Sequence, residues 1–208
     1  MKIEKAVALI SGGIDSPVAV QKVKEFGIEV VGVTFHYVPL ANEDSIEKTK
    51  KLSKMVGIKK LYVIPFAEAQ AEVVRKTEHR KFFIITRRIM WRVAEEIAKK
   101  EKVQALVTGE NLAQVASQTL QNMKVTDDVV ELPILRPLLG FDKLDIIKIA
   151  RKLGTYEVSK GPELCCMLGP KHPETASRID MIEREEEKLD VDKMVKELLE
   201  KAEIVELN

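Results

Sequence analysis

The sequence predicts an α/β protein built on a doubly wound, five-stranded parallel sheet with a C-terminal helical extension. Short apolar runs of strand length alternate with amphipathic runs of helix length through residues 5–154. The connections between them are short, as in strand–helix–strand units. Polar or glycine-containing segments follow three of the strands, at Ser11–Ser16, Thr34–His36 and Thr108–Asn111. Ligands bind beyond the carboxyl ends of the strands in such sheets, so we expect the site there.

Composition sets the class of protein. The chain has 208 residues, 45% of them apolar and 32% charged, which is typical of one globular domain with a small appendage. Its net charge of +1 neither requires nor excludes a nucleic-acid partner. It shows no apolar run of membrane-spanning length and no signal peptide, and its two cysteines are adjacent. We therefore expect a cytoplasmic protein with no membrane association and no disulfide framework.

The first strand, turn and helix predict an anion site. Val7–Ile10 is an apolar run, and Ser11–Gly13 is a turn with two glycines that tolerate unusual backbone angles. Asp15 and Ser16 can cap the helix that follows, and Pro17 suits its first turn. Backbone N–H groups and the positive end of a helix dipole then meet in one concavity, which favours phosphate. The alternative is an ordinary glycine turn followed by a helix cap.

The middle of the chain continues the alternation. Residues 28–35 are almost continuously apolar, as in a strand buried on both faces, and residues 61–64 form a third strand. Residues 43–56 are an amphipathic helix with Ile46, Leu52 and Met55 inward, which Gly57 ends. Ala67–Lys102 is a long helical region that we expect to break near Thr77 or Phe82. Later elements are a strand at 104–108, a helix at 115–123, a strand at 132–135 and a helix at 142–153.

From Gly161 the character of the sequence changes. A loop rich in glycine and proline carries Cys165 and Cys166, and residues 176–202 form a charge-rich helical stretch. We expect a domain at 1–176 and a helical extension at 177–208 that packs on it, with a homodimer contact as the alternative. Glu183–Lys188 is interpreted as a solvated face, and the segment around Asp190 as a cap that restarts the helix.

Two motifs carry a family resemblance. The order Ser-Gly-Gly-x-Asp-Ser at residues 11–16 resembles the PP-loop of N-type ATP pyrophosphatases, which have the adenine nucleotide alpha hydrolase fold. The run Thr-Gly-Glu-Asn-Leu-Ala-Gln-Val-Ala-Ser-Gln-Thr-Leu-Gln-Asn at residues 108–122 closely resembles a signature of the tRNA uridine 4-sulfurtransferases, also called the ThiI family. The likeness covers roughly residues 5–176. It implies ATP and Mg²⁺ as cofactors and adenylation of a tRNA uridine as the activity.

The resemblance also implies roles for individual residues. Asp15 and Lys143 match the pair needed for adenylation, with Asp15 beside Mg²⁺. The other positions contact the nucleotide: Leu9, Ile10, Thr34 and Phe35 the adenine and ribose, Ser11, Gly12, Gly13 and Ser16 the pyrophosphate, and Arg87, Gly109 and Gln118 the nucleotide more generally. From the residues alone, Asp15 could be a helix cap and Lys143 a solvated lysine. Arg87 and Arg88 cannot be told apart in this way.

Cys165 and Cys166 are the candidates for sulfur chemistry. A thiolate is favoured near Lys160, Lys171 or His172, and the resemblance implies that one cysteine attacks or resolves a persulfide. Either cysteine fits that role, and the alternative is a pair of small buried side chains. The adjacent spacing does not indicate a metal site. A cysteine desulfurase or a rhodanese is the expected persulfide donor.

Two regions found in members of the family have no counterpart in this chain, the tRNA-gripping THUMB region and the rhodanese domain. A separate THUMB-containing protein could therefore present the tRNA. The best RNA surface within the chain is a basic stretch from Arg75 to Arg92 with Phe82, Phe83 and Trp91 interleaved, and the alternative is a solvated helix face above a core. Two other functions stay open: adenylation of another substrate, such as another RNA base or a sulfur carrier of the thiamine pathway, and an ATP-binding subunit of a split enzyme.

Overall fold

The computed structural model describes residues 2–38, 44–112, 114–160 and 168–207. Within them, one sheet has the strand order β5-β4-β1-β2-β3-β6. The strands are β1 Lys5–Leu9, β2 Glu29–His36, β3 Lys60–Pro65, β4 Ala105–Val107, β5 Ile134–Leu135 and β6 Glu203–Glu206. The first five are parallel, with Val7 paired to Val31 and to Leu106. The predicted parallel sheet is confirmed.

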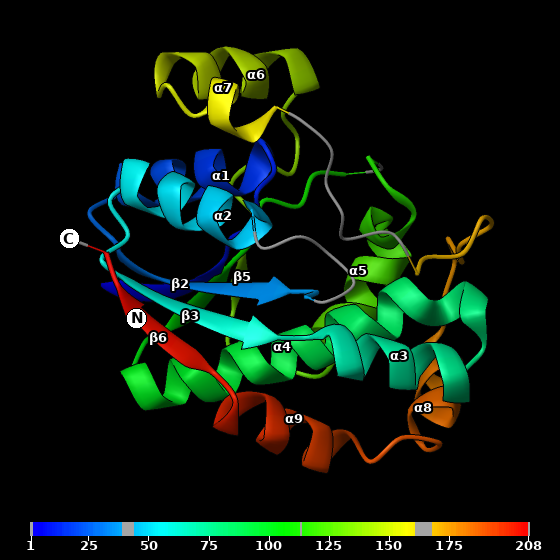
Figure 1. Ribbon diagram of the computed structural model, residues 1–208. Coiled ribbons are helices and arrows are strands. Elements are labelled where there is room, and N and C mark those ends of the chain that lie inside the picture. The colour runs from blue at the N-terminus through cyan, green and yellow to red at the C-terminus, as the bar shows by residue number, and fades with distance from the viewer. Residues whose placement is uncertain (1, 39–43, 113, 161–167, 208) are drawn as a thin grey trace.

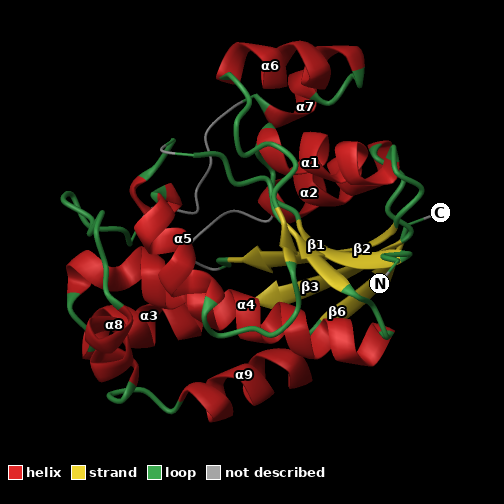
Figure 2. Cartoon of the chain, turned by 180° about the vertical axis from the view of Figure 1, so that it is seen from behind, coloured by secondary structure: helices red, strands yellow, loops and turns green. Residues whose placement is uncertain are grey.

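Helices cover both faces of this sheet. In Figures 1 and 2, α1 and α2 lie on one face and α3, α4 and α9 on the other, while α6 and α7 stack beyond α1 and α2. The helical elements of the described chain are α1 Asp15–Lys24, α2 Asp44–Met55, α3 Ala67–Lys76, α4 Phe82–Glu101, α5 Leu120–Asp127, α6 Lys143–Lys152, α7 Tyr156–Ser159, α8 Ile179–Glu186, α9 Val191–Glu200 and the 3₁₀ turns η1 His79–Lys81 and η2 Ala116–Gln118. No helix among the described residues has the length and apolar content to cross a membrane.

Strand alternation divides the interior into two cores. Val7 and Leu9 of β1 face α3, α4, α8 and α9, whereas Ala6 and Ala8 face α1 and α2. Successive side chains of a strand point to opposite faces, which is why strands covered on both sides read as continuous apolar runs. A third cluster packs α6 on α1 through Ile146, Ala150, Val18 and Ala19. It fixes the start of α6 close to the start of α1.

The strand order places a topological switch point between β1 and β4. From β1 the chain moves to β2 and β3 on one side, and later to β4 and β5 on the other. In a doubly wound sheet the crevice outside the carboxyl ends of two such strands is where ligands bind. Here that crevice lies between Ser11–Ser16, after β1, and Thr108–Asn111, after β4.

Several helix limits match the sequence. The long helical region breaks at Thr77, and α4 begins at Phe82 after η1, as expected. Gly27, Gly57 and Gly154 have positive φ angles after α1, α2 and α6. The helix predicted at 115–123 is wrong in detail: Val115 is extended, η2 follows, and Thr119 caps a separate α5 by accepting from the Asn122 N–H. Met55 is 41% exposed rather than inward.

The end of the chain differs most from expectation. Asp190 caps α9 through the Lys193 N–H, as predicted, but residues 203–206 form β6, which pairs antiparallel with β3. The sheet therefore gains a sixth strand that the helical interpretation of this segment missed. The division at residues 176 and 177 into domain and extension stays a prediction.

Glu185 and Glu186 of α8 are buried rather than solvated, which corrects the interpretation of Glu183–Lys188. Glu186 accepts from Arg88 Nη2 at 2.9 Å and from Arg92 Nη1 at 2.7 Å. Glu185 accepts from the Glu78 N–H at 2.8 Å. Burial by itself raises the pKa of Glu186, but the two arginines outweigh it and lower that pKa. The carboxylates thus hold α8 against α4 and the turn before it.

Candidate active site

The loop between β1 and α1 is braced by its own serines. The Ser11 N–H donates to Ser16 Oγ at 2.9 Å, and the two hydroxyl oxygens are 3.2 Å apart. The Gly13 N–H donates to Ser11 Oγ at 3.2 Å. The residue before the helix is Ile14, which makes no side-chain cap. The first N–H groups of α1 have no intrahelical acceptor, as at any helix start, and with the helix dipole they favour an anion here.

Asp15 and Lys143 meet at this loop. Lys143 Nζ donates to both carboxylate oxygens of Asp15, at 2.6 and 2.8 Å. Asp15 is the first residue of α1 and Lys143 the first of α6, whose cap is Asp142. The Asp15 side chain is 27% exposed and the Lys143 side chain 44% exposed, so a ligand can reach both. Asp15 is therefore not simply a helix cap, and Lys143 is not simply a solvated lysine, because the two side chains bind each other.

Gly109 lies directly against the start of α1. A Cβ placed on it would come within 2.7 Å of the Ser16 nitrogen and 2.8 Å of the Asp15 carbonyl carbon. Real Cβ atoms do not approach backbone so closely, so any other residue at this position would displace the backbone of the neighbouring loop. The turn after β4 thereby supports the loop after β1 across the switch point.

Arg87 and Arg88, which the sequence could not separate, have different surroundings. Arg88 is 2% exposed and donates to Glu186 and, at 2.6 Å, to the Val125 carbonyl. The Arg87 side chain is partly exposed, with Nε 3.5 Å from Glu110 Oε1. Glu110 belongs to the turn that carries Gly109. Arg87 is therefore the arginine on the side of the site, and Arg88 holds the fold together.

Glu110 is a buried carboxylate between two arginines. Its Oε2 accepts from Arg136 Nε at 3.0 Å, and Arg136 also donates to both oxygens of Asp127, at 2.9 and 2.6 Å. Glu110 Oε1 is buried next to Arg87 and forms no hydrogen bond within the described ranges of the chain. Burial alone lowers the pKa of Arg136, but its two acidic partners outweigh that effect and raise it. These ion pairs connect α4, α5 and the residue that follows β5 to the turn that carries Gly109.

Replacing Glu110 by Gln is expected to lower the free energy of unfolding by about 1–3 kcal/mol, because two arginines lose a buried carboxylate. Urea unfolding monitored by circular dichroism measures this change. Glu131→Gln, at an exposed position, is the matched control. Equal midpoints for Glu110→Gln and wild type would show that the cluster does not stabilise the fold.

The predicted site residues at the ends of β1 and β2 have side chains that are wholly or largely buried. Leu9 and Ile10 are buried in the two cores, and the Ile10 N–H donates to the Val33 carbonyl at 2.9 Å. Thr34 is buried, and the Phe35 ring packs edge-on against Phe66. The next residue, His36, has a buried Nδ1 without a hydrogen-bond partner among the described residues, and burial lowers its pKa although Glu203 opposes the shift.

The remaining predicted residues lie further along the chain. Gln118 ends η2, and its Oε1 is buried without a hydrogen-bond partner in the described part of the chain. An unpartnered buried carbonyl oxygen suits a residue that meets a ligand. Cys165 and Cys166 lie outside the described residues.

A family model described as "Thiamine biosynthesis protein (ThiI)" matches residues 2–191. The chain belongs to the ThiI family. It is 41% identical over 207 residues to a "Probable tRNA sulfurtransferase" of Acetivibrio thermocellus, covering 97% of this chain and 53% of that protein. A protein of the same name from Moorella thermoacetica is 43% identical over 207 residues, with the same coverage.

Solved structures agree with the ThiI assignment. A 4-thiouridine synthetase in complex with RNA and bound ATP superposes with a TM-score of 0.94 at 35% identity, covering 99% of this chain and 55% of that one. The NMN synthetase of Francisella tularensis, at 14% identity and a TM-score of 0.61 over 96% of this chain and 85% of that one, shares the fold. The predicted PP-loop fold is thus confirmed. This ThiI chain spans about half the length of the curated relatives it matches.

One further residue beside the loop was not predicted from the sequence. The Lys48 side chain of α2 lies over Gly12, where an added Cβ would be 3.2 Å from Lys48 Cδ. Its Nζ donates to the Ser159 carbonyl at 2.9 Å, at the end of α7. The signal was available: α2 follows β2, and helices that follow parallel strands begin near the carboxyl edge of the sheet.

Proposed function

We propose that this chain supplies the ATP-dependent adenylation and sulfur-transfer chemistry of a tRNA sulfurtransferase that forms 4-thiouridine. The observation that carries the proposal is the Asp15–Lys143 pair at the open N-terminus of α1, within the switch-point crevice. The names of the relatives and of the ATP-bound structural neighbour support the same chemistry. A protein that modifies tRNA in this way would work in the cytoplasm.

In the proposed reaction the uracil O4 attacks the α-phosphorus of ATP. An oxygen–phosphorus bond forms, the α–β anhydride bond breaks, and pyrophosphate leaves. The N–H groups of Ser11–Ser16 would hold the phosphates, and Lys143 and Arg87 would stabilise the negative charge that develops on them. The adenosine would meet the backbone at Leu9, Ile10, Thr34 and Phe35, because those side chains are wholly or largely buried. Gln118 and Gly109 complete the proposed nucleotide contacts.

The residues fit a magnesium ion carried in with ATP. Mg²⁺ commonly uses one or two carboxylates together with phosphate oxygens, and Asp15 offers one accessible carboxylate at the phosphate loop. The described residues include no group of three or more His, Cys, Asp and Glu that would form an all-protein metal site. When bound, Mg²⁺ would neutralise charge on the leaving pyrophosphate. Asp15 also orients Lys143.

Sulfur transfer would complete the reaction. The terminal sulfur of a persulfide attacks C4, AMP leaves with the former O4, and a second thiol takes over the inner sulfur as a disulfide, releasing the thiocarbonyl. Cys165 or Cys166 would carry the persulfide or act as the second thiol. A cysteine desulfurase or a rhodanese would supply the sulfur. The second cysteine need not be in this chain.

The half-length match favours a second version of the proposal. The chain covers 53% of the tRNA sulfurtransferase from Acetivibrio thermocellus. In this version it is the ATP-binding part of a divided enzyme, and a separate THUMB-containing protein presents the tRNA. Both versions use the same Asp15–Lys143 site.

AMP release from radiolabelled ATP, with and without unmodified tRNA, tests the function. We expect AMP and pyrophosphate to form only when tRNA is present. If the chain binds ATP but releases AMP only after a THUMB-containing protein is added, the divided enzyme is favoured. AMP release that ignores tRNA but responds to another acceptor would contradict the assignment of tRNA as substrate.

A further inference from the structure

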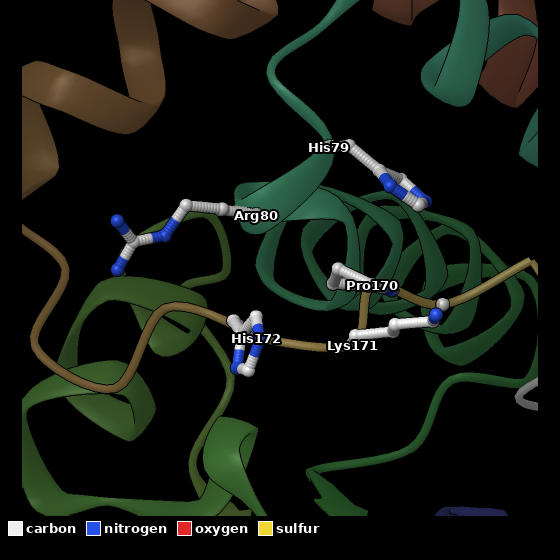
Figure 3. Close-up of a pocket in the computed structure, with 6 residues that line it drawn as sticks. His79, Arg80, Pro170, Lys171 and His172 are labelled. Carbon is white, nitrogen blue, oxygen red and sulfur yellow. The ribbon is translucent and has the colours of Figure 1, made fainter.

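A basic pocket lies apart from the phosphate loop, beside the start of α4. Its volume is about 730 Å³, and six residues line it: His79, Arg80, Gly169, Pro170, Lys171 and His172. In Figure 3 the Arg80 and His172 side chains lie on one side of Pro170, and His79 and Lys171 on the other. Four nitrogen-bearing side chains from two distant segments thus surround one open hollow.

The two segments are fastened together, so the pocket is a built feature. His79 Nε2 donates to the Leu168 carbonyl at 2.7 Å, and the Glu174 N–H donates to the Arg80 carbonyl at 2.9 Å. Gly169 sits on the Phe83 ring, where an added Cβ would be 2.3 Å from Cζ. These contacts hold the residue 168–174 strap at both ends against η1 and α4.

The charge in the pocket is only partly compensated. Glu174 Oε2 forms an ion pair with Arg80 Nη2 at 3.6 Å, but the Arg80 side chain is still 59% exposed. Glu174 Oε1 accepts from the Thr175 and Ala176 N–H groups. Lys171 and His172 are exposed and form no ion pair within the part of the chain that the structure describes. Elsewhere on this basic stretch, Lys81, Arg88 and Arg92 are bound to acidic residues. Phe82 and Trp91 are buried, which excludes them as base-stacking residues.

We propose that this pocket binds the phosphodiester backbone of an RNA strand, with Arg80 and Lys171 as the principal phosphate contacts. The hollow is open and its cationic groups are spread along it, which suits successive phosphates better than one enclosed anion. Arginine and lysine contacts to phosphate fix the position of a nucleic acid without reading its sequence. Lys171 follows Cys166 by five positions in the sequence, so the contact would hold the RNA close along the chain to the cysteines.

The inference deepens the proposed function, since it places the RNA substrate on this chain. The test is binding of fluorescently labelled, unmodified tRNA to the full chain, followed by anisotropy across a range of salt concentrations. The variant is Arg80→Gln with Lys171→Gln. At about 0.1 M salt we expect affinity to fall tenfold or more, and the slope of log K against log salt to shrink by about 1 to 2.

The matched control is Lys193→Gln with Lys196→Gln on α9, two exposed lysines whose removal changes the net charge equally. Affinity and salt slope should stay at wild-type values in the control. Equal losses in both double variants, or tRNA binding unaffected by the pocket variant, would overturn the proposal. So would unchanged tRNA binding combined with lost sulfur transfer, which would indicate an acidic protein donor instead.

The same preparations separate this inference from the proposed function. AMP release with tRNA tests the function, whereas the anisotropy tests the pocket. Pocket-dependent tRNA binding without AMP release would remove the function and leave the pocket in place. If the pocket variant releases AMP with an unchanged KM for tRNA, the proposed function stands and the pocket proposal fails.

Discussion

Lys143→Met and Asp15→Ala should each reduce tRNA-dependent AMP release by about 100- to 1,000-fold, the usual cost of losing one group that stabilises transition-state charge. Lys143 places a cation at the phosphate loop, and both oxygens of Asp15 hold it there, at 2.6 and 2.8 Å. Removing Lys143 takes away the charge. Removing Asp15 leaves the lysine without its anchor, so both changes act on one device.

Because the two residues act together, the double variant should be little slower than the worse single variant. The measurement is initial AMP release at saturating ATP and tRNA, with circular dichroism as the check on folding. Lys148→Met is the matched control, since Lys148 lies on the same helix and forms an exposed ion pair with Asp145 at 2.8 Å within that helix. It should retain wild-type activity. Folded Asp15→Ala and Lys143→Met proteins with wild-type rates would remove the basis of the proposed function.

The parts of the site that the sequence predicts best are those set by backbone geometry. A turn with two glycines between a strand and a helix has few uses, and its position at the end of β1 follows from the alternation of strands and helices. The family signature led to Gly109, and the structure supplies the reason for that glycine. The register of the parallel strands then brings the two turns together.

Side-chain pairing was less predictable. Arg87 and Arg88 are neighbours in the sequence, and a helix turns them about 100° apart, so only the packing of α8 decides which one is buried. Glu186, 98 positions further along the chain, binds Arg88 and so accounts for the burial of that arginine. For the same reason the acidic run on α8 was interpreted as solvated, and the basic run on α4 as an RNA surface or a solvated face, although Glu186 pairs with Arg88 and Arg92.

The last strand was missed for a different reason. Glu203–Glu206 is short, half charged and mostly exposed, and it follows directly on a helix with a clear apolar stripe. Its strand conformation comes from pairing with β3, whose edge would otherwise be open. Nothing local in those four residues signals that partner.

Gly109→Ala should weaken ATP binding and AMP release by about 100-fold while leaving a folded protein, because the added methyl group displaces the phosphate loop. A Cβ at this position would lie 2.7 Å from the Ser16 nitrogen and 2.8 Å from the Ser16 Cα. Those atoms belong to the first turn of α1, so they cannot yield as a flexible side chain would. The loop that donates N–H groups to phosphate must move instead, and Asp15 must move with it.

Gly140→Ala is the matched control, since a Cβ there meets nothing within 4 Å and the residue lies close in sequence to Lys143. Calorimetric titration with ATP and the AMP assay should give wild-type values for this variant. If Gly109→Ala binds ATP as tightly as Gly140→Ala, the close approach of the two turns does not position the phosphate loop. A loss in ATP affinity for Gly109→Ala alone would show that the turn after β4 sets the geometry of the loop after β1. Packing between the two turns at the switch point would then be what shapes the proposed nucleotide site.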